Sequence, residues 1–401
     1  MWIATLAIGA LYIGSTVLTP LYPIYQREFG ISPLSVTIVY AVYAIGNLLV
    51  LFLFGRLSDQ LGRRITALIA FGLTIVSAVV FLFATGISGL LVGRAINGFA
   101  AGLGAASLTA WIAELEPHKD RSRAAVIASA GNLGGLAVGG VLCGLLAEYA
   151  PAPLRIVFVV LIVGLVLITL ALTRVKETVA RKLQQTTDLD LRPRVGVPAN
   201  IRLAFVAPAC MAFAAFALGG FFSALVPGLV TRELHLQSVA LIGAIVTIFF
   251  AVACLTAGLS RRLRSWTAMF AGAGCVFPAV ALLICAEHLR SLAWLCAAAI
   301  VAGAAMALSY RGSLQVLNEI APQEQRAELV SSYLLMCYLG NSLPVLGVGL
   351  LATLLAPPTA HALFAVVVAG LAVAAIVVGA TNMKKAGLKG NVIVDSDRRT
   401  I

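Results

Sequence analysis

The chain has 401 residues, of which 61% are hydrophobic and 11% charged, with a mean hydropathy of +1.02 and a formal net charge of +12. Soluble globular chains carry roughly 25% charged residues, so this composition excludes a water-soluble fold and indicates a protein whose solvent is lipid. The positive balance fits loops that face anionic lipid, so it gives no reason to expect a nucleic-acid partner.

Twelve long apolar runs follow one another along the chain. A helix of about 20 residues, at ~1.5 Å per residue, matches the ~30 Å hydrocarbon core of a bilayer. The sequence therefore predicts an all-α membrane protein of twelve transmembrane helices, over residues 2–26, 34–55, 64–84, 88–113, 123–147, 154–173, 201–229, 237–259, 266–286, 291–317, 328–355 and 359–380. The first run is expected to be a retained span that is kinked near Pro20 and Pro23.

A short charged stretch, Gly55-Arg56-Leu57-Ser58-Asp59-Gln60-Leu61-Gly62-Arg63-Arg64, separates the second run from the third. Its two glycines free the backbone at both helix ends, and its aspartate is an acceptor among cations. The pattern Gly-x-Leu-x-Asp-x-x-Gly-Arg-Arg at this place resembles the loop signature of the major facilitator superfamily of transporters. The resemblance covers residues 1–380 and implies two pseudo-symmetric six-helix bundles around a central cavity, with a gating loop formed by Gly55, Asp59, Gly62, Arg63 and Arg64.

The two halves of the sequence echo one another. Glu114-Leu115-Glu116-Pro117 corresponds to Glu319-Ile320-Ala321-Pro322 at a shift of 205 residues, and Leu57-Ser58-Asp59 corresponds to Leu259-Ser260-Arg261 at a shift of 202. Such a repeat predicts a substrate site at the membrane midplane between the halves. The expected division is an N-terminal bundle, a cytoplasmic linker, a C-terminal bundle and a disordered cytoplasmic tail, over residues 1–174, 175–199, 200–380 and 381–401.

Two readings of the linker stay open. Val175, Val179 and Leu183 have the spacing of one helix face, so part of the linker could lie on the inner membrane surface. A solvated tether explains the same residues.

Lysines and arginines set the orientation. Most of the 28 lie in or beside loops that share one side of the membrane, whereas Arg27, Arg155, Arg232 and Arg290 fall on the other side and Arg94 lies within a span. Because basic loops stay in the cytoplasm, a multi-pass protein of the cytoplasmic (inner) membrane with both termini cytoplasmic is expected.

Arg94 in the fourth span is costly unless it finds acceptors in the bundle interior. It could instead snorkel outward, or pair internally with Glu28, Glu148 or backbone carbonyls. Arg-x-x-Asn-Gly-x-x-x-Gly at this place resembles the family's fourth-helix motif, whose arginine is implicated in proton coupling. The coupling residues expected from this resemblance are Arg94, Asn97, Glu28 and Glu148.

Glycine pairs in the fourth and fifth spans predict close helix packing. Gly98 and Gly102 form one pair, and a ladder of Gly131, Gly135 and Gly139 runs beside Gly140 and Gly144. The ladder resembles the fifth-helix motif of the family's antiporters, with Gly140 in place of a proline and Cys143 in place of a glycine. These departures weaken the implication of antiport and leave the packing prediction intact.

Polar and aromatic side chains inside the spans indicate a substrate cavity. Arg311 either snorkels to the inner surface or acts as a cavity cation, and no acidic residue falls at mid-span. The four histidines lie in loops or at span ends, so no acid–histidine relay is expected. The cavity residues predicted are Tyr22, Tyr25, Tyr43, Asn47, Arg94, Tyr310, Arg311 and Asn341. A cavity with arginine and no carboxylate favours neutral or anionic substrates over cations.

The function expected is secondary active transport of a small organic molecule by alternating access. Resemblance to bacterial multidrug-type exporters implies efflux by antiport, with the proton as coupling ion. An organic-anion uptake carrier and a non-transporting receptor of the same fold remain alternatives. The chain contains no Walker motif and no catalytic set, and its seven cysteines lack metal-type spacing, so we expect no enzyme, cofactor or metal. Membrane lipid is the other expected partner, and the expected state is a monomer.

Overall fold

The computed structural model describes residues 1–54, 57–179 and 195–397, and every element in these ranges is helical. Twelve helical segments within them are long and apolar enough to cross a membrane, as the sequence predicts. The first half contains α1 (Trp2–Thr16), α2 (Tyr22–Phe29), α3 (Pro33–Leu53), α4 (Leu57–Leu61), α5 (Arg63–Leu82), α6 (Ile87–Leu115), α7 (Arg121–Tyr149) and α8 (Pro153–Leu172). The second half contains α9 (Arg202–Ala224), α10 (Val226–Gly228), α11 (Val239–Leu259), α12 (Ser265–His288), α13 (Leu292–Ile320), α14 (Arg326–Leu351) and α15 (Pro357–Asp397).

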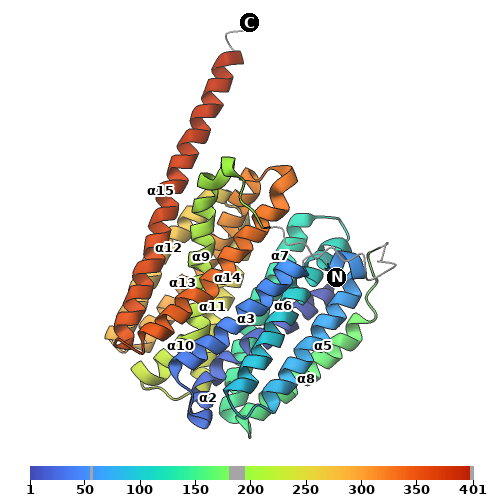
Figure 1. Cartoon of the computed structure of the whole chain (residues 1–401), viewed down its shortest axis with the longest axis vertical. Coiled ribbons are helices and arrows are strands. Elements are labelled where there is room, and N and C mark those ends of the chain that lie inside the picture. Colours follow the sequence, from blue (N-terminus) through green and yellow to red (C-terminus); the bar gives the residue numbers. More distant parts are fainter. Residues whose placement is uncertain (55–56, 180–194, 398–401) are drawn as a thin grey trace.

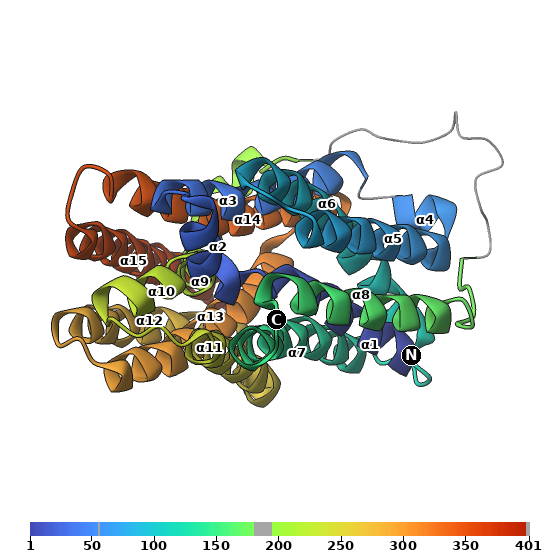
Figure 2. The same ribbon diagram turned by 90° about the horizontal axis from the view of Figure 1, so that it is seen from below.

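The two halves form two bundles that lie side by side (Figures 1 and 2). Each has its own apolar core, around Phe71 and Phe158 in the N-terminal half and around Phe221 and Phe249 in the C-terminal half. Close packing of these side chains holds the helices together in lipid. Lipid tails are as apolar as leucine, so the attraction comes from tight contact between helices. The bundles meet along α3 with α14 and along α7 with α11.

The molecule has two ends, the loop face and the opposite face. The loop face carries α4 and the turn between α6 and α7, and the opposite face carries α2 and α10, at the bottom of Figure 1.

The first helix of each half is interrupted near the opposite face. In the first half, α1 gives way to a 3₁₀ turn at Thr19–Leu21 before α2, which confirms the predicted kink at Pro20 and Pro23. In the second half, α9 ends at Ala224, and α10 and a π-helical turn at Leu229–Glu233 follow. Proline lacks the amide hydrogen that would continue the helical hydrogen-bond ladder, so Pro20 and Pro227 account for the two breaks.

The C-terminal tail differs from the expected disorder. Helix α15 continues to Asp397 and projects beyond the bundle at the top of Figure 1. The segment after residue 380 contains no proline, the residue that breaks helices most strongly. Leu183 of the proposed surface helix lies outside the described residues, as does Gly55.

Candidate functional site

Four tyrosines from both halves gather where the bundles meet. Tyr12 of α1 and Tyr43 of α3 approach Tyr310 of α13 and Tyr338 of α14. All four tyrosines are partly accessible. Solvent therefore reaches an aromatic surface to which each half contributes two rings, with Phe216 of α9 packed edge-on to Tyr310 at 5.4 Å between ring centroids.

Amide side chains accompany these rings. Tyr338 donates to Asn47 Oδ1 over 3.2 Å, and Tyr43 donates to Ser15 Oγ over 3.2 Å. Asn132 of α7 serves as hydrogen-bond partner of the Tyr12 hydroxyl. Flat apolar faces with a few fixed polar groups suit an organic molecule with aromatic and hydrogen-bonding parts. Of the predicted cavity residues, Tyr43, Asn47 and Tyr310 belong to this cluster, together with Tyr12, which the sequence analysis did not select.

The halves touch each other near the opposite face. The Tyr40 hydroxyl donates to Asn341 Oδ1 over 3.0 Å, and Thr37 of α3 packs directly on Gly349 of α14. Among the described residues, the hydrogen bond of Tyr338 with Asn47 joins α14 and α3 nearer the loop face. Between α3 and α14, these contacts close the junction of the halves at the opposite face.

Glu148 joins the halves at their second junction, between α7 and α11. Its Oε2 accepts from the backbone N–H groups of Val239 and Ala240, over 2.7 and 3.2 Å, at the start of α11. A helix N-terminus has unsatisfied N–H groups and partial positive charge, which a carboxylate complements. Glu148 is thus a clasp between α7 and α11, and Arg94 is not its partner in this arrangement.

Arg94 is buried in the N-terminal half, with only 1% of its surface exposed, so the snorkelling interpretation is wrong. Its Nη1 donates to the Ser15 carbonyl over 2.8 Å, and its Nη2 donates to the Tyr22 hydroxyl over 2.6 Å. The rings of Tyr22, Tyr40 and Tyr43 lie 5.6–5.9 Å from the guanidinium carbon. All of these partners are neutral, so the cation is held by dipoles and aromatic faces instead of a carboxylate. Glu28 lies exposed beyond α2's buried turns.

Three polar atoms near this arginine lack a hydrogen-bond partner among the described residues. They are Arg94 Nε, Asn97 Oδ1 and Tyr25 Oη. Buried atoms of this kind are usually satisfied by ordered water, so the Arg94 site has unused capacity for water or a polar ligand. Tyr22 and Tyr25 therefore belong to the surroundings of Arg94, and the tyrosine surface between the bundles is formed by other residues.

The gating loop is tied within its own half by a charge network. Arg63 lies 2.5 Å from Asp59 and 2.7 Å from Glu114 of α6, and it also donates to Ser58 Oγ over 3.0 Å. Asp59 keeps 59% of its side chain exposed. In this arrangement, which is closed at the opposite face, Asp59 pairs with Arg63 inside the N-terminal half.

Glu177 completes this network from the linker, a contact that sequence reasoning missed. Its carboxylate accepts from the N–H groups of Arg63 and Arg64 at the start of α5, over 3.0 and 3.1 Å. It also accepts from Thr178 and Val179 N–H. Burial opposes ionisation, but these four donors outweigh it and hold the pKa of the Glu177 carboxyl below its ordinary value. Gly62 has φ +101° and lies against Glu177, so glycine is required there.

The second half fastens its equivalent loop differently. Arg311 donates to the carbonyls of Ser260, Arg261 and Leu263, at the end of α11. Ser265 donates to Glu319 over 2.5 Å, at positions that the repeat relates to Arg63 and Glu114. A cation at a helix C-terminus complements its dipole, so Arg311 is committed to this loop in place of the cavity.

The glycines divide into two packing surfaces. A methyl group on Gly135 or Gly139 would meet the backbone of α1, at Gly9 and Ile13, within the same half. A methyl group on Gly140 or Gly144 would meet Gly243 of α11, across the junction between halves, at 3.0 and 3.1 Å. Gly98 and Gly102 pack α6 against α3, on Tyr43 and Val50. Of these three pairs, Gly140 and Gly144 are the one that packs across the junction between the halves.

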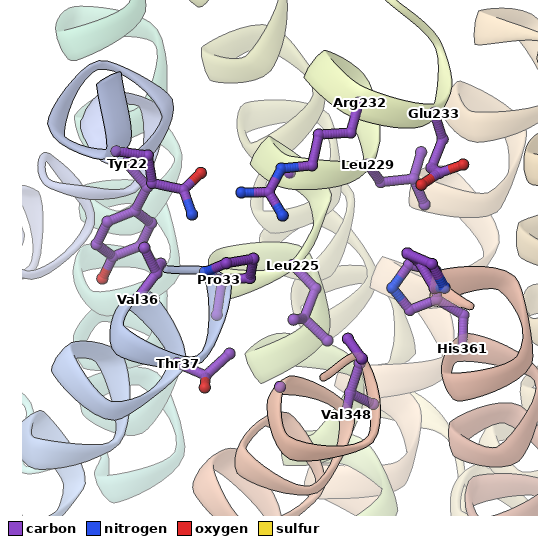
Figure 3. A pocket seen from close by; sticks show the side chains of 16 residues that line it. Tyr22, Pro33, Val36, Thr37, Leu225, Leu229, Arg232, Glu233, Val348 and His361 are labelled. Carbon is purple, nitrogen blue, oxygen red and sulfur yellow. The ribbon is translucent and has the colours of Figure 1, made fainter. Parts of the chain in front are cut away.

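A small cavity of about 70 Å³ lies between the halves at the opposite face (Figure 3). Tyr22 and Thr37 line it from the first half, and Arg232, Glu233 and His361 line it from the second. It has room for a few waters and is too small for an organic substrate. His361, near the start of α15, also bonds to Glu287, near the end of α12, a pairing between two helix ends that the sequence analysis did not anticipate.

Comparisons with known proteins agree with this architecture. The family profile described as Major Facilitator Superfamily matches residues 4–345. Quinolone resistance protein NorA of Staphylococcus aureus is 27% identical over 115 residues, which is 28% of this chain and 29% of that protein. Multidrug resistance protein 1 of Bacillus subtilis is 32% identical over 139 residues, 34% of this chain and 35% of that protein. The matched segments thus span about a third of the length of these relatives.

A solved structure resembles nearly the whole chain. It is the crystal structure of a bacterial homologue of the human lysosomal transporter Spinster, in an inward-facing and unoccupied conformation. The TM-score is 0.70, with 17% sequence identity and 94% of both chains covered. At this identity the likeness concerns the fold.

Proposed function

Because the chain belongs to the Major Facilitator Superfamily, a family of transporters, we propose that it moves a small organic molecule across the cytoplasmic membrane by alternating access. The observation that carries the proposal is the tyrosine surface to which Tyr12, Tyr43, Tyr310 and Tyr338 contribute from both halves. A site shared by two rigid bundles is exposed to one side or the other when the bundles rock, which is the physical requirement for alternating access.

The described arrangement corresponds to the inward-facing state under this proposal. If the basic loops and both termini lie in the cytoplasm, the opposite face is the outer one. The contacts of Thr37 with Gly349 and of Glu148 with α11 then close the outer side. Asp59, which pairs with Arg63 of its own half and is largely exposed, would engage the C-terminal half when the inner side closes.

Export coupled to protons is the proposed direction and energy source. Support comes from the named resistance proteins among the relatives and from Arg94, a buried cation at the position of the family's fourth-helix motif. Neutral or anionic compounds are the proposed substrates, since Arg94 lies 5.6 Å from the Tyr43 ring of the tyrosine surface and its hydrogen-bond partners are neutral. We propose a monomer surrounded by lipid as the working unit.

Flux through proteoliposomes tests the proposal. Purified full-length protein, reconstituted with an imposed pH gradient, should accumulate the fluorescent quinolone norfloxacin on the acidic side. Liposomes without protein and a variant with Tyr43 and Tyr338 both changed to Ala serve as controls. Equal flux in protein-containing and empty liposomes, for norfloxacin and for neutral and anionic dyes, would reject transport and leave the receptor interpretation.

Uptake of an organic anion is the second candidate. The neutral environment of Arg94 favours it, since a buried cation without a carboxylate can be balanced by an anionic substrate. The direction of net flux under a known pH gradient separates the two candidates.

A further inference from the structure

Two buried titratable side chains pair in the C-terminal half, away from the tyrosine surface. His361 Nδ1 lies 2.8 Å from Glu287 Oε1, and the two residues are 7% and 6% exposed. Glu287 is the residue before the last of α12, and His361 lies in the first turns of α15. The pair therefore connects two helices of this half near the opposite face.

The surroundings of the pair are apolar on the protein side. The ring of Phe221 meets His361 edge-on at 5.3 Å between centroids, and Phe364 stacks beside Phe221 at 4.7 Å. A carboxylate in such surroundings needs a donor, and histidine Nδ1–H supplies it. With Nδ1–H donating to Glu287, the Nε2 atom of His361 carries the lone pair that can accept a further proton.

Water can reach the histidine through the small cavity between the halves. His361 lines this cavity, and the other titratable or charged residues that line it are Tyr22, Arg232 and Glu233 (Figure 3). On α12, His288 is exposed and bonds to the Ile284 carbonyl, so it does not compete for Glu287. A volume of about 70 Å³ holds a few waters, which suffices to deliver a proton.

We propose that Glu287 and His361 form a proton-binding site reached from the opposite face, and that proton binding stabilises the closed state of that face. The proton passes from a cavity water to His361 Nε2, and the pair changes from net charge −1 to a neutral imidazolium–carboxylate pair. A neutral pair tolerates a nearly dry, closed cavity, whereas a net negative pair is stabilised by hydration and so by opening.

This inference rests on the proposed function for its meaning in transport, where it links outer acidity to closure of the outer side. The site itself requires one proton on the Glu287–His361 pair and the contacts that close the opposite face. The closure contacts involved are those of Thr37 with Gly349 and of Tyr40 with Asn341.

Histidine NMR tests the proton site directly. The chain has four histidines, so ¹⁵N-histidine labelling gives few resonances, and His361→Gln assigns the one of interest. We expect the His361 resonance to change from the neutral to the doubly protonated form as pH falls in the wild type, and this change to be altered in Glu287→Gln, because the carboxylate is the hydrogen-bond partner of the imidazole. A His361 resonance that keeps one protonation state as pH falls, or that behaves identically in Glu287→Gln, would overturn the site.

Hydrogen–deuterium exchange tests the link to closure. Exchange times are adjusted for the intrinsic effect of pH, and peptides covering residues 22–37 and 349–361 are followed. We expect their protection to rise as pH falls in the wild type and to be flat in Glu287→Gln and His361→Gln. Glu233→Gln, which alters the other carboxyl of the same cavity, and His288→Gln should keep the wild-type profile. Wild-type profiles in both pair variants, or their loss in Glu233→Gln, would contradict the proposal.

Transport measurements separate the two proposals. If wild-type protein moves no norfloxacin while the pair titrates and controls protection, the proposed function fails and the proton site stands. If wild-type protein transports norfloxacin while His361 does not titrate, the proton site fails and the proposed function stands.

Discussion

Arg94 shows how a buried cation is kept in the membrane without an acid. Its two terminal nitrogens point to a carbonyl and a hydroxyl in a fork that lysine cannot reproduce. We expect Arg94→Lys to keep folded protein and lower transport about tenfold, a loss of about 1.4 kcal/mol of transition-state stabilisation. Arg94→Ala should lower it further.

The measurement is initial flux at fixed protein density, with thermal stability as the control for folding. Ser107 lies on α6, as Arg94 does, and its hydroxyl donates to the Arg63 carbonyl of α5. Ser107→Ala therefore provides a matched loss of a polar contact on the same helix, away from Arg94. Full flux in Arg94→Lys would show that charge alone suffices and that the fork geometry has no function.

Glu177 gives a residue-scale prediction with a pH dependence. At neutral pH, Glu177→Gln should lower stability by about 1 kcal/mol, the usual size of a helix N-cap contribution. Because the pKa of the folded carboxyl is depressed, the contribution is present above the unfolded pKa and is lost as pH falls through the folded pKa. The melting temperatures of wild type and variant should therefore converge in acid, and a difference that persists unchanged at pH 3 would exclude the cap.

At the scale of elements, α7 presents glycines to two different neighbours. Leucine at Gly144 would collide with α11 across the junction, whereas leucine at Gly135 would collide with α1 inside the first half. We expect Gly144→Leu to abolish flux while most folded protein is retained, and Gly135→Leu to reduce the yield of folded protein itself.

Size-exclusion profiles and flux per folded molecule separate these outcomes. Gly134→Leu, where an added side chain meets open space, is the control on the same helix. If Gly144→Leu transports normally, the contact between α7 and α11 does not need close approach during the cycle.

Helix existence was predictable, and the partners of side chains were not. Runs of apolar residues determine where spans begin and end, and Pro20 with Pro23 predicts the break in the first one. By contrast, Glu287 and His361 are 74 residues apart, and no local pattern relates them. Tyr12 was missed for a similar reason, since a tyrosine in an apolar run has the same local signature whether it faces lipid, core or cavity.

A cross-link between the halves at the opposite face tests whether transport requires that face to open. A Cβ built on Gly349 lies 3.0 Å from Thr37 Cβ, near the ~3.5–4.5 Å that disulfides span. In a background without the seven native cysteines, Thr37→Cys with Gly349→Cys should form a disulfide on oxidation and stop flux. Reduction should restore it.

Each single cysteine variant is the control, since it carries the substitution without the cross-link. Flux that continues in the fully oxidised double variant would mean that the opposite face need not open, which contradicts alternating access between these halves.

Charge selectivity also belongs to the whole molecule, because both halves contribute to the cavity. We expect carboxylate and neutral forms of one aromatic scaffold to bind more tightly than its quaternary ammonium form, by about tenfold or more. Equilibrium binding to wild type and Arg94→Ala measures this preference, and tight binding of the quaternary form that survives the substitution would refute it.

The repeat fastens its two loops by unlike forces, and this difference has a consequence for ionic strength. The loop of the first half is tied by ion pairs of Arg63 with Asp59 and Glu114, at a partly exposed surface, while that of the second half uses Arg311 on carbonyls and Ser265 on Glu319. Exposed ion pairs are screened within a Debye length of about 10 Å at 0.1 M salt, and hydrogen bonds to carbonyls are screened much less. Rising salt should therefore weaken the contacts of the first loop more than those of the second, so the two bundles would differ in how their loops respond to ionic strength.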